Sequence, residues 1–359
     1  MTILAIIVFV LIFSLLVLAH EWGHFAAARR NGVGVEEFGL GLPPRIWGIK
    51  KGKTIYSINW IPFGGFVKLK GEGDRHPRGR DALPNQSYGV RILVTTGGVL
   101  MNFALAWVAV MIGFWLGMPP IASAVTDYVG SSTEVKAHVI VLQSEKGSPA
   151  EAAGLQPGDE IVAANGATIA SVADLQEAIA GTTQAKLTVQ RQQETLTITT
   201  AVKTQSGRQL IGIIADELIE SARYTWWQVP YFALVELGRV IKMIAEAIYG
   251  VVASMLTTAS LPDSIAGPVG IAKITAQAVQ LGWLSVLQWL IFLSVNLGVI
   301  NIVPFPALDG GRLLFLLVEI ARGGRRVKPE IENLVHNLGF VLLLAFIFTV
   351  TYRDIVRLL

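Results

Sequence analysis

Residues 3–24 read ILAIIVFVLIFSLLVLAHEWGH, an apolar stretch that ends in a His-Glu-x-x-His string. No Asp, Glu, Lys or Arg occurs between residues 2 and 19. A helix of about 20 apolar residues can cross roughly 30 Å of hydrocarbon. A secretory signal would instead need a basic start and an apolar run of about 7–15 residues, and neither is present. The stretch therefore predicts a retained transmembrane helix that carries two histidines and a glutamate near its end.

The composition of the whole chain agrees with a membrane protein. Of its 359 residues 52% are hydrophobic and only 15% are charged. Three further stretches, 92–118, 274–308 and 334–352, also lack charge. We expect a polytopic α-helical protein with four transmembrane helices, the third stretch being long enough for a span plus a re-entrant segment. The absence of cysteine excludes disulfides and thiolate zinc sites, and a net charge of +3 gives no reason to expect nucleic acid.

The distribution of charge predicts the orientation. Residues 29–91 hold twelve Lys or Arg against five acids, whereas 119–273 hold ten against fifteen, and 310–333 are basic again. Short cytoplasmic loops carry the excess of basic residues. We therefore expect the first and third loops, and the His-Glu-x-x-His end of the first helix, on the cytoplasmic side of the lipid bilayer, with the large acidic segment on the opposite side.

Residues 121–203 have the texture of a small α+β domain. Short runs such as 138–142, 186–190 and 195–199 alternate as strands do, and 172–180 has helical spacing after Ser171, a residue type that caps helices. The stretch GSPAEAAGLQPGDEIVAANG, 147–166, resembles PDZ domains of the bacterial protease type. The resemblance implies binding of peptide C-termini or exclusion of substrate ectodomains. Another small β-sandwich with a Pro-Gly-Asp turn is the alternative.

Residues 218–262 are amphipathic, with Trp226 and Tyr231 among charged residues such as Arg239 and Glu246. Aromatic rings and basic groups suit the headgroup boundary, and burying several charges in a full span would be costly. We expect an interfacial helix here, and a soluble helix packed on the neighbouring domain is the other interpretation.

The HEWGH string at 20–24 points to metal chemistry. His20 and His24, four residues apart, share one helical face and can bind one zinc ion, with Glu21 beside a metal-activated water. Asp309 follows thirty-five uncharged residues in NIVPFPALDGG, 301–311, where two prolines prevent a continuous helix. Irregular backbone at membrane depth is tolerated where it lines a cavity. We expect Asp309 to be the third zinc ligand, a role that is compatible with capping the helix that follows it.

Taken together, HEWGH, the distal NxxPxPALDGG and an intervening GPVGI at 267–271 resemble the site-2 protease family of intramembrane zinc metalloproteases, and within it the regulator-of-sigma-E branch. The resemblance implies His20, His24 and Asp309 as Zn²⁺ ligands and Glu21 as catalytic acid and base. It also implies substrate hydrogen bonds from Asn301 and Asn296. Implied substrates are single-span membrane proteins, such as anti-sigma factors or remnant signal peptides, in a bacterial inner membrane. The chain has room for one PDZ domain, whereas the best-known proteobacterial members have two.

Residues 54–58 and 62–70 are expected to form a β-hairpin next to the catalytic helix. A peptide bond inside a helix is hidden from a nucleophile, and an exposed strand edge at Gly64, Gly65 and Phe66 could hold a substrate extended by strand addition. A surface hairpin that binds lipid headgroups through its lysines is the alternative.

Two other functions fit parts of the sequence. A membrane-anchored PDZ adaptor would have a structural metal site with four protein ligands. A zinc transporter would need polar residues along several spans. The expected organisation is 1–118 for the first two transmembrane helices and the hairpin, 121–203 for the PDZ-like domain, 218–262 for the interfacial helix, and 274–359 for the last two transmembrane helices.

Overall fold

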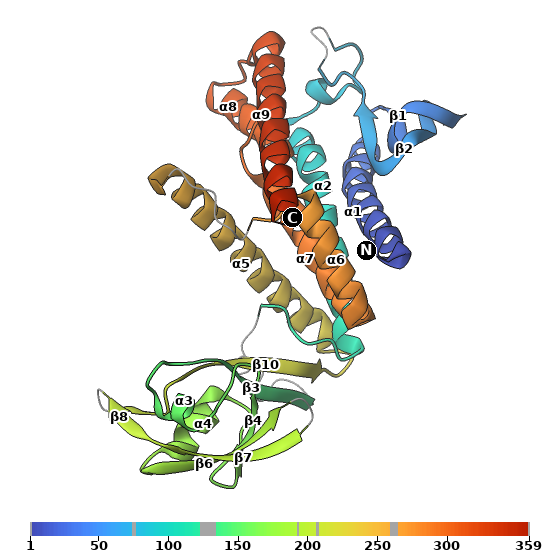
Figure 1. Ribbon diagram of the computed structural model, residues 1–359. Coiled ribbons are helices and arrows are strands. Elements are labelled where there is room, and N and C mark those ends of the chain that lie inside the picture. The colour runs from blue at the N-terminus through green and yellow to red at the C-terminus, as the bar shows by residue number, and fades with distance from the viewer. Residues whose placement is uncertain are drawn as a thin grey trace. The chain divides into compact units, whose positions relative to one another are not determined.

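The computed structural model describes residues 2–73, 77–122, 134–191, 194–205, 208–258 and 265–357. The chain divides into two compact units, each described by itself. The membrane unit contains Met1–Val110 and Leu237–Leu359, and the β unit contains Met111–Glu236. Figure 1 shows the elements of each unit, coloured from blue at the N-terminus to red at the C-terminus.

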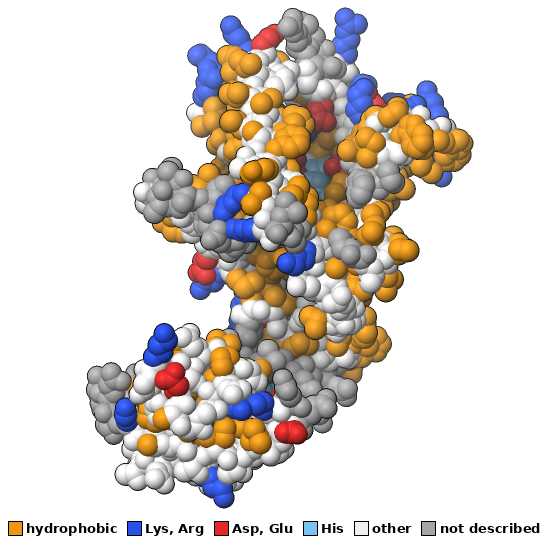
Figure 2. All heavy atoms as spheres, in the orientation of Figure 1, with side chains coloured by type: hydrophobic (Ala, Val, Ile, Leu, Met, Phe, Trp, Pro, Cys, Tyr) orange, Lys and Arg blue, Asp and Glu red, His pale blue; other side chains and the backbone are white. Residues whose placement is uncertain are grey.

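The membrane unit is built on long apolar helices. Helices α1 (Ile3–Arg30), α2 (Tyr88–Trp115), α7 (Trp283–Ile302) and α9 (Pro329–Val356) are each long and apolar enough to cross a membrane. This agrees with the four expected spans. Ile12 and Leu16 of α1 pack against Leu293 of α7, while hydrophobic side chains remain on the outer face of α9 (Figure 2). Such outward apolar surface is what a bilayer solvates.

The third charge-free stretch is broken, as its length and prolines predict. Helix α6 (Pro268–Leu281) ends at Gly282, whose φ of 109° is open to glycine, and α7 begins at the next residue. After α7 a short loop containing both prolines leads into α8 (Asp309–Ala321). Asp309 is therefore the first residue of a separate helix rather than a residue inside a span.

A β-sheet lies beside α1 (Figure 1). It consists of β1 (Val35–Lys51) and β2 (Thr54–Leu69), followed by the short 3₁₀ helix η1 (Leu83–Asn85) before α2. Residues 54–59 of β2 pair on one side with 45–51 of β1. On the other side residues 55–58 pair with 37–40 of β1, and the segment 35–40 in turn pairs with 65–69 of β2. The tight turn lies at Gly52, with φ 65°. The hairpin expected from 54–58 and 62–70 is therefore wrong, because both runs pair with residues 35–40 of β1 and not with each other. Residues 65–69 have one strand partner among the described residues and form an edge.

The β unit is a sheet with two small helices. Its strand order is β10-β3-β4-β6-β7, with β5 paired to β4 and a separate β8-β9 pair. The elements are β3 (Glu134–Ser144), α3 (Pro149–Ala152), β4 (Glu160–Ala164), β5 (Ala167–Thr168), α4 (Val172–Ile179), β6 (Gln184–Arg191), β7 (Glu194–Ala201), β8 (Lys203–Gln205), β9 (Arg208–Leu210) and β10 (Ile213–Arg223). The expected strands and the Ser171 cap are present, and Ser171 and Asp174 form a capping box.

Two expected boundaries change. Residues 218–223 belong to β10, which pairs antiparallel with β3, so the sheet extends beyond residue 203. The helix expected over 218–262 is α5 (Val229–Thr258). The sequence alone does not decide between helix and strand at 218–223, because Leu218 and Ile219 suit either a helix face or a strand. Pairing with β3 makes this segment a strand. Residues 123–133 of the expected domain and 259–264 of the expected helix lie outside the described residues.

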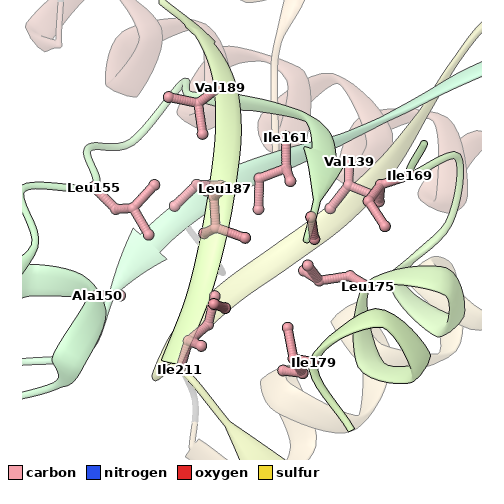
Figure 3. Packing of buried hydrophobic residues seen from close by; sticks show 13 residues of the cluster. Val139, Ala150, Leu155, Ile161, Ile169, Leu175, Ile179, Leu187, Val189 and Ile211 are labelled. Atoms are coloured by element: carbon pink, nitrogen blue, oxygen red, sulfur yellow. The ribbon is translucent and has the colours of Figure 1, made fainter. Parts of the chain in front are cut away.

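The core of the β unit is formed by buried side chains of the strands and of helix α4. Side chains of β3, β4, β6 and α4 meet there, among them Val139, Ile161, Leu187 and Leu175 (Figure 3). Beside this core, buried Asp159 accepts hydrogen bonds from the Arg191 side chain at 2.6 and 2.7 Å and from the backbone N–H of Gln156 at 2.9 Å. Burial raises the pKa of Asp159, but these donors outweigh it and hold the pKa below its usual range.

Leu187→Ala should destabilise the β unit by about 2–5 kcal/mol, because it removes a fully buried side chain and leaves a cavity. Amide hydrogen exchange of the full chain in detergent, read in β3, β4 and β6, measures the loss. Leu142→Ala is the matched control, since Leu142 on β3 is 53% exposed. Equal loss of protection in the two variants would contradict the packing described here.

Candidate metal centre

Three buried or half-buried side chains from distant parts of the chain meet at one point. His20 and His24 lie on α1, and Asp309 begins α8. The two Nε2 atoms are 3.2 Å apart and lie 3.1 Å (His20) and 3.2 Å (His24) from Asp309 Oδ2. Figure 2 shows histidine atoms at the bottom of a hollow between apolar surfaces. The structure thus brings together the trio that the sequence singles out.

The spacing of these atoms fits a zinc ion. Zinc bonds of about 2.0–2.1 Å in a tetrahedron put ligand atoms about 3.3 Å apart. Asp309 Oδ2 is buried and has no hydrogen bond of good geometry within the described chain, although two ring nitrogens lie near it. Three electron-rich atoms this close to one another repel unless a proton or a metal cation lies between them. Two imidazoles and one carboxylate are a donor set that zinc accepts, with a fourth position open.

A contact on the side of the His24 ring away from Asp309 determines its tautomer and orientation. His24 Nδ1 lies 2.7 Å from the carbonyl oxygen of Val94 on α2. A carbonyl only accepts, so Nδ1 carries the proton and Nε2 offers its lone pair to the trio. His20 Nδ1 faces another α2 residue, Asn102, whose Nδ2 is 3.2 Å away.

Glycines on α2 allow this helix to reach the imidazoles. A Cβ placed on Gly98 would lie 2.6 Å from His20 Cε1 and closer still to His24 Nε2. At the same crossing a Cβ on Gly97 would lie 2.7 Å from the carbonyl oxygen of Gly23. Small residues let membrane helices approach backbone to backbone. This role of Gly97 and Gly98 was not predicted, and the sequence signal for it is the Gly-Gly pair inside an apolar span.

The loop before Asp309 is held by residues that admit little change. Ala307 has φ 79°, and its amide donates to His336 Nδ1 of α9 at 3.0 Å. A Cβ on Gly310 would collide with the carbonyl oxygens of Val303 and Ile302. The Pro-x-Pro-Ala-Leu-Asp-Gly-Gly string is therefore a tight support for one carboxylate.

The other end of α8 is fixed by a charged pair. Arg91, near the start of α2, donates from Nη1 and Nη2 to the two carboxylate oxygens of Glu319, each at 2.8 Å. Burial raises the pKa of Glu319, yet Arg91 outweighs this effect and the pKa lies below its usual range. Helix α8 is thus attached to α2 at one end and presents Asp309 at the other.

Glu21 lies against the sheet edge. Its Oε2 accepts a hydrogen bond from the Val67 amide of β2 at 3.0 Å. A Cβ on Gly65 would be 3.8 Å from Glu21 Cγ, and one on Gly64 would be 3.1 Å from Val17 of α1. The half-buried Phe66 pairs with Gly39 of β1. Of the predicted strand-edge residues Gly64, Gly65 and Phe66, Gly65 therefore lies beside Glu21, and the other two are its neighbours on the same strand.

The two predicted asparagines behave differently. Asn301 lines a small pocket together with Asp309 and with Thr95 and Val99 of α2. Asn296 is half-buried on the same helix, and five residues of helix turn it about 140° from Asn301. Asn301 is thus beside the metal trio, whereas a substrate contact from Asn296 stays a prediction.

The GPVGI string lies outside this centre. Asp354 of α9 is buried, and its Oδ2 accepts from the Gly270 amide at 2.7 Å. This contact places a carboxylate at the N-terminus of α6, where unpaired amides favour negative charge. A Cβ on Gly267 would be 2.8 Å from the same oxygen, which explains the glycine. The motif joins α6 to α9.

Helices long and apolar enough to cross a membrane, a His₂Asp trio with zinc spacing and a glutamate beside it are together the features of a membrane metalloprotease. The comparison with protein families agrees: the chain belongs to peptidase family M50, the site-2 protease family, whose model matches residues 8–346. It is a zinc metalloprotease with several apolar membrane helices.

Relatives match along nearly the whole chain. A zinc metalloprotease candidate of Clostridium perfringens is 32% identical over 354 residues, covering 98% of both chains. Zinc metalloprotease RasP of Shouchella clausii is 29% identical over 436 residues, covering 98% of this chain and 99% of the relative. Regulator of sigma-W protease RasP of Bacillus subtilis is 28% identical over 447 residues, covering 98% of each.

Gly98→Ala should weaken zinc binding by about tenfold or more, because the added methyl group displaces both imidazoles from their positions. Gly89→Ala on the same helix is the control, since nothing lies within 4 Å of its added Cβ. Competition with a chromophoric chelator measures the affinity of the purified proteins. Unchanged zinc affinity in Gly98→Ala would mean that α2 does not contact the metal centre.

Proposed function

We propose that this zinc metalloprotease is an intramembrane endopeptidase that cleaves transmembrane segments of single-span membrane proteins in regulated intramembrane proteolysis. The observation that carries the proposal is the convergence of His20 Nε2, His24 Nε2 and Asp309 Oδ2 within 3.1–3.2 Å of one another, at the end of an apolar helix and beside Glu21. A carboxylate and two imidazoles in such surroundings are costly unless they serve a bound cation.

In this proposal His20, His24 and Asp309 hold the ion and Glu21 moves the proton. Zinc, when bound, supplies Lewis-acid activation of water and of the scissile carbonyl near neutral pH. Glu21 takes a proton from the attacking water and gives it to the leaving amine. The Val67 amide holds one oxygen of Glu21, which leaves the other for the proton. Asn301, next to Asp309 in the pocket, donates to the substrate carbonyl, and Asn296 has the same proposed role.

The substrate is proposed to bind as a strand along residues 65–69. This edge has one strand partner in the described chain and runs past Glu21. Strand addition gives affinity through backbone hydrogen bonds and makes little demand on sequence. Gly64, Gly65 and Phe66 lie at the start of the edge, where the absence of side chains at the two glycines leaves room for a second backbone.

We further propose that the β unit is a PDZ-like domain on the extracytoplasmic side, and that the metal centre faces the cytoplasm of a bacterial inner membrane. The basic loops 29–91 and 310–333 support this orientation. The domain would bind peptide C-termini or exclude bulky ectodomains. The Bacillus subtilis relative is named a regulator of sigma-W, which supports anti-sigma-factor-like substrates, and remnant signal peptides are a second class.

The PDZ adaptor with a structural metal site is disfavoured. A structural zinc site has four protein ligands, whereas the candidate cluster in the described residues has three and a neighbouring glutamate.

Glu21→Gln should lower the cleavage rate of a single-span reporter by about 10²–10⁴-fold, because the amide cannot take a proton. Zinc content should not change, since the amide oxygen still accepts from Val67 and no ligand is lost. His24→Ala is the contrasting control and should lose zinc together with activity. Full cleavage by Glu21→Gln would refute the assigned role.

Strand binding predicts that substrates which leave the helical state easily are cleaved faster. Replacing two Ala of the reporter's membrane segment with Gly costs the helix about 1 kcal/mol per residue. The rate should therefore rise by roughly 5–30-fold for a total of about 2 kcal/mol. The same reporters with Glu21→Gln enzyme control for other proteases. Equal rates for the Ala and Gly reporters would show that the strand edge does not select an extended substrate.

A further inference from the structure

Asn102 is a polar residue that the proposed mechanism does not yet use, and it lies in the middle of the apolar span α2. It is fully buried. Its Nδ2 lies 3.2 Å from His20 Nδ1, while its Oδ1 is buried with no hydrogen-bond partner within the described residues. An unsatisfied buried amide oxygen costs about 1–3 kcal/mol, so this arrangement calls for an explanation.

The geometry of His20 determines which of its nitrogens carries the proton. Nε2 is the atom that faces the metal trio, 3.1 Å from Asp309 Oδ2 and 3.2 Å from His24 Nε2. A neutral imidazole that binds a metal through Nε2 carries its hydrogen on Nδ1. His24 has this tautomer, because its Nδ1 faces the Val94 carbonyl at 2.7 Å. His20 must therefore also present an Nδ1–H to its neighbour.

Two donors cannot face each other, so the orientation of the Asn102 amide follows. The oxygen and nitrogen of an amide are assigned from their hydrogen bonds and exchange by a half turn of the group. That half turn brings Oδ1 to His20 Nδ1–H and places the Nδ2 group where the oxygen stood.

We propose that Asn102 is a positioning residue of the metal centre, which accepts a hydrogen bond from His20 Nδ1–H through its Oδ1 and so fixes the ring in the tautomer that binds zinc. The residue is itself fixed, because its backbone carbonyl accepts from the buried Ser294 hydroxyl of α7 at 2.8 Å. The inference rests on the proposed function, in which His20 is a ligand. In this proposal a side-chain amide supports His20, whereas a backbone carbonyl, that of Val94, supports His24.

The test compares zinc affinity in Asn102→Leu and Asn102→Asp, both in the full chain in detergent. Loss of an outer partner of a ligating histidine costs about 10–100-fold in metal affinity, which is the result expected for Asn102→Leu. Asn102→Asp has only acceptor atoms, so it should bind zinc within a few-fold of the unchanged protein. If Asn102 acted as a donor, both variants would lose affinity together, and that result would overturn the proposal.

Two controls separate this inference from general damage. Phe103→Leu changes the neighbouring residue, whose ring packs on Gly298 of α7, and it should retain zinc affinity. His20→Ala tests the proposed function itself: if it binds zinc normally, His20 is no ligand and the proposed function fails. If His20→Ala loses zinc while Asn102→Leu retains it, only the inference about Asn102 fails.

A second experiment observes the tautomer of His20 directly and does not depend on a zinc-affinity measurement. Nitrogen NMR of ¹⁵N-histidine-labelled protein distinguishes Nδ1–H from Nε2–H rings, and His20→Ala assigns the His20 signals. We expect the Nδ1–H form at His20 in the unchanged protein, and a shift toward a mixture in Asn102→Leu. An Nε2–H ring at His20 in the unchanged protein would overturn the proposal.

Discussion

The structure depends on three ligand atoms that must meet at one point within apolar surroundings. Two come from one turn of α1 and need only helical spacing, but the third must come from the far end of the chain. Asp309 Oδ2 reaches within 3.2 Å of both imidazoles. In the proposed function a shared cation favours this meeting, because the charges would otherwise be costly at membrane depth. The broken α7–α8 connection and the Arg91–Glu319 pair are the means by which the carboxylate arrives there.

A second constraint is the chemistry of peptide cleavage in a membrane. Helical substrates hide their peptide bonds, so a protease must offer backbone partners outside the helical state. In the proposed function the sheet meets this need beside α1, where the Val67 amide contacts Glu21. One backbone group thus links the edge that would hold an extended substrate to the carboxylate that would move the proton. Catalysis by positioned groups depends on such preorganisation.

The sequence predicts the parts of this site that are local or unusual. His20 and His24 are visible because spacing of four is a helical face, and Asp309 because it is an acid after a long uncharged run with prolines. Gly98 and Asn102 were not predicted, since a glycine or asparagine in an apolar span has many packing roles. Val67 could not be predicted at all, because a backbone amide leaves no trace in residue type. The strand at 218–223 was misjudged because its apolar pair suits both periods and only pairing with β3 decides between them.

One face of α2 sets the orientation of both histidines. Val94, Gly98 and Asn102 are spaced by four and therefore form a single stripe along the helix. The backbone carbonyl of Val94 lies against His24, and the side-chain amide of Asn102 lies against His20. Between them Gly98 leaves space for both imidazole rings. A register shift of one residue would rotate α2 by about 100° and remove all three contacts together. Arg91, one turn before the stripe, is bonded to Glu319 on α8, the helix that carries Asp309. The pair therefore joins the α2 stripe to the helix that carries Asp309 in a single interaction, which is a structural reason for a charged pair beside an apolar span.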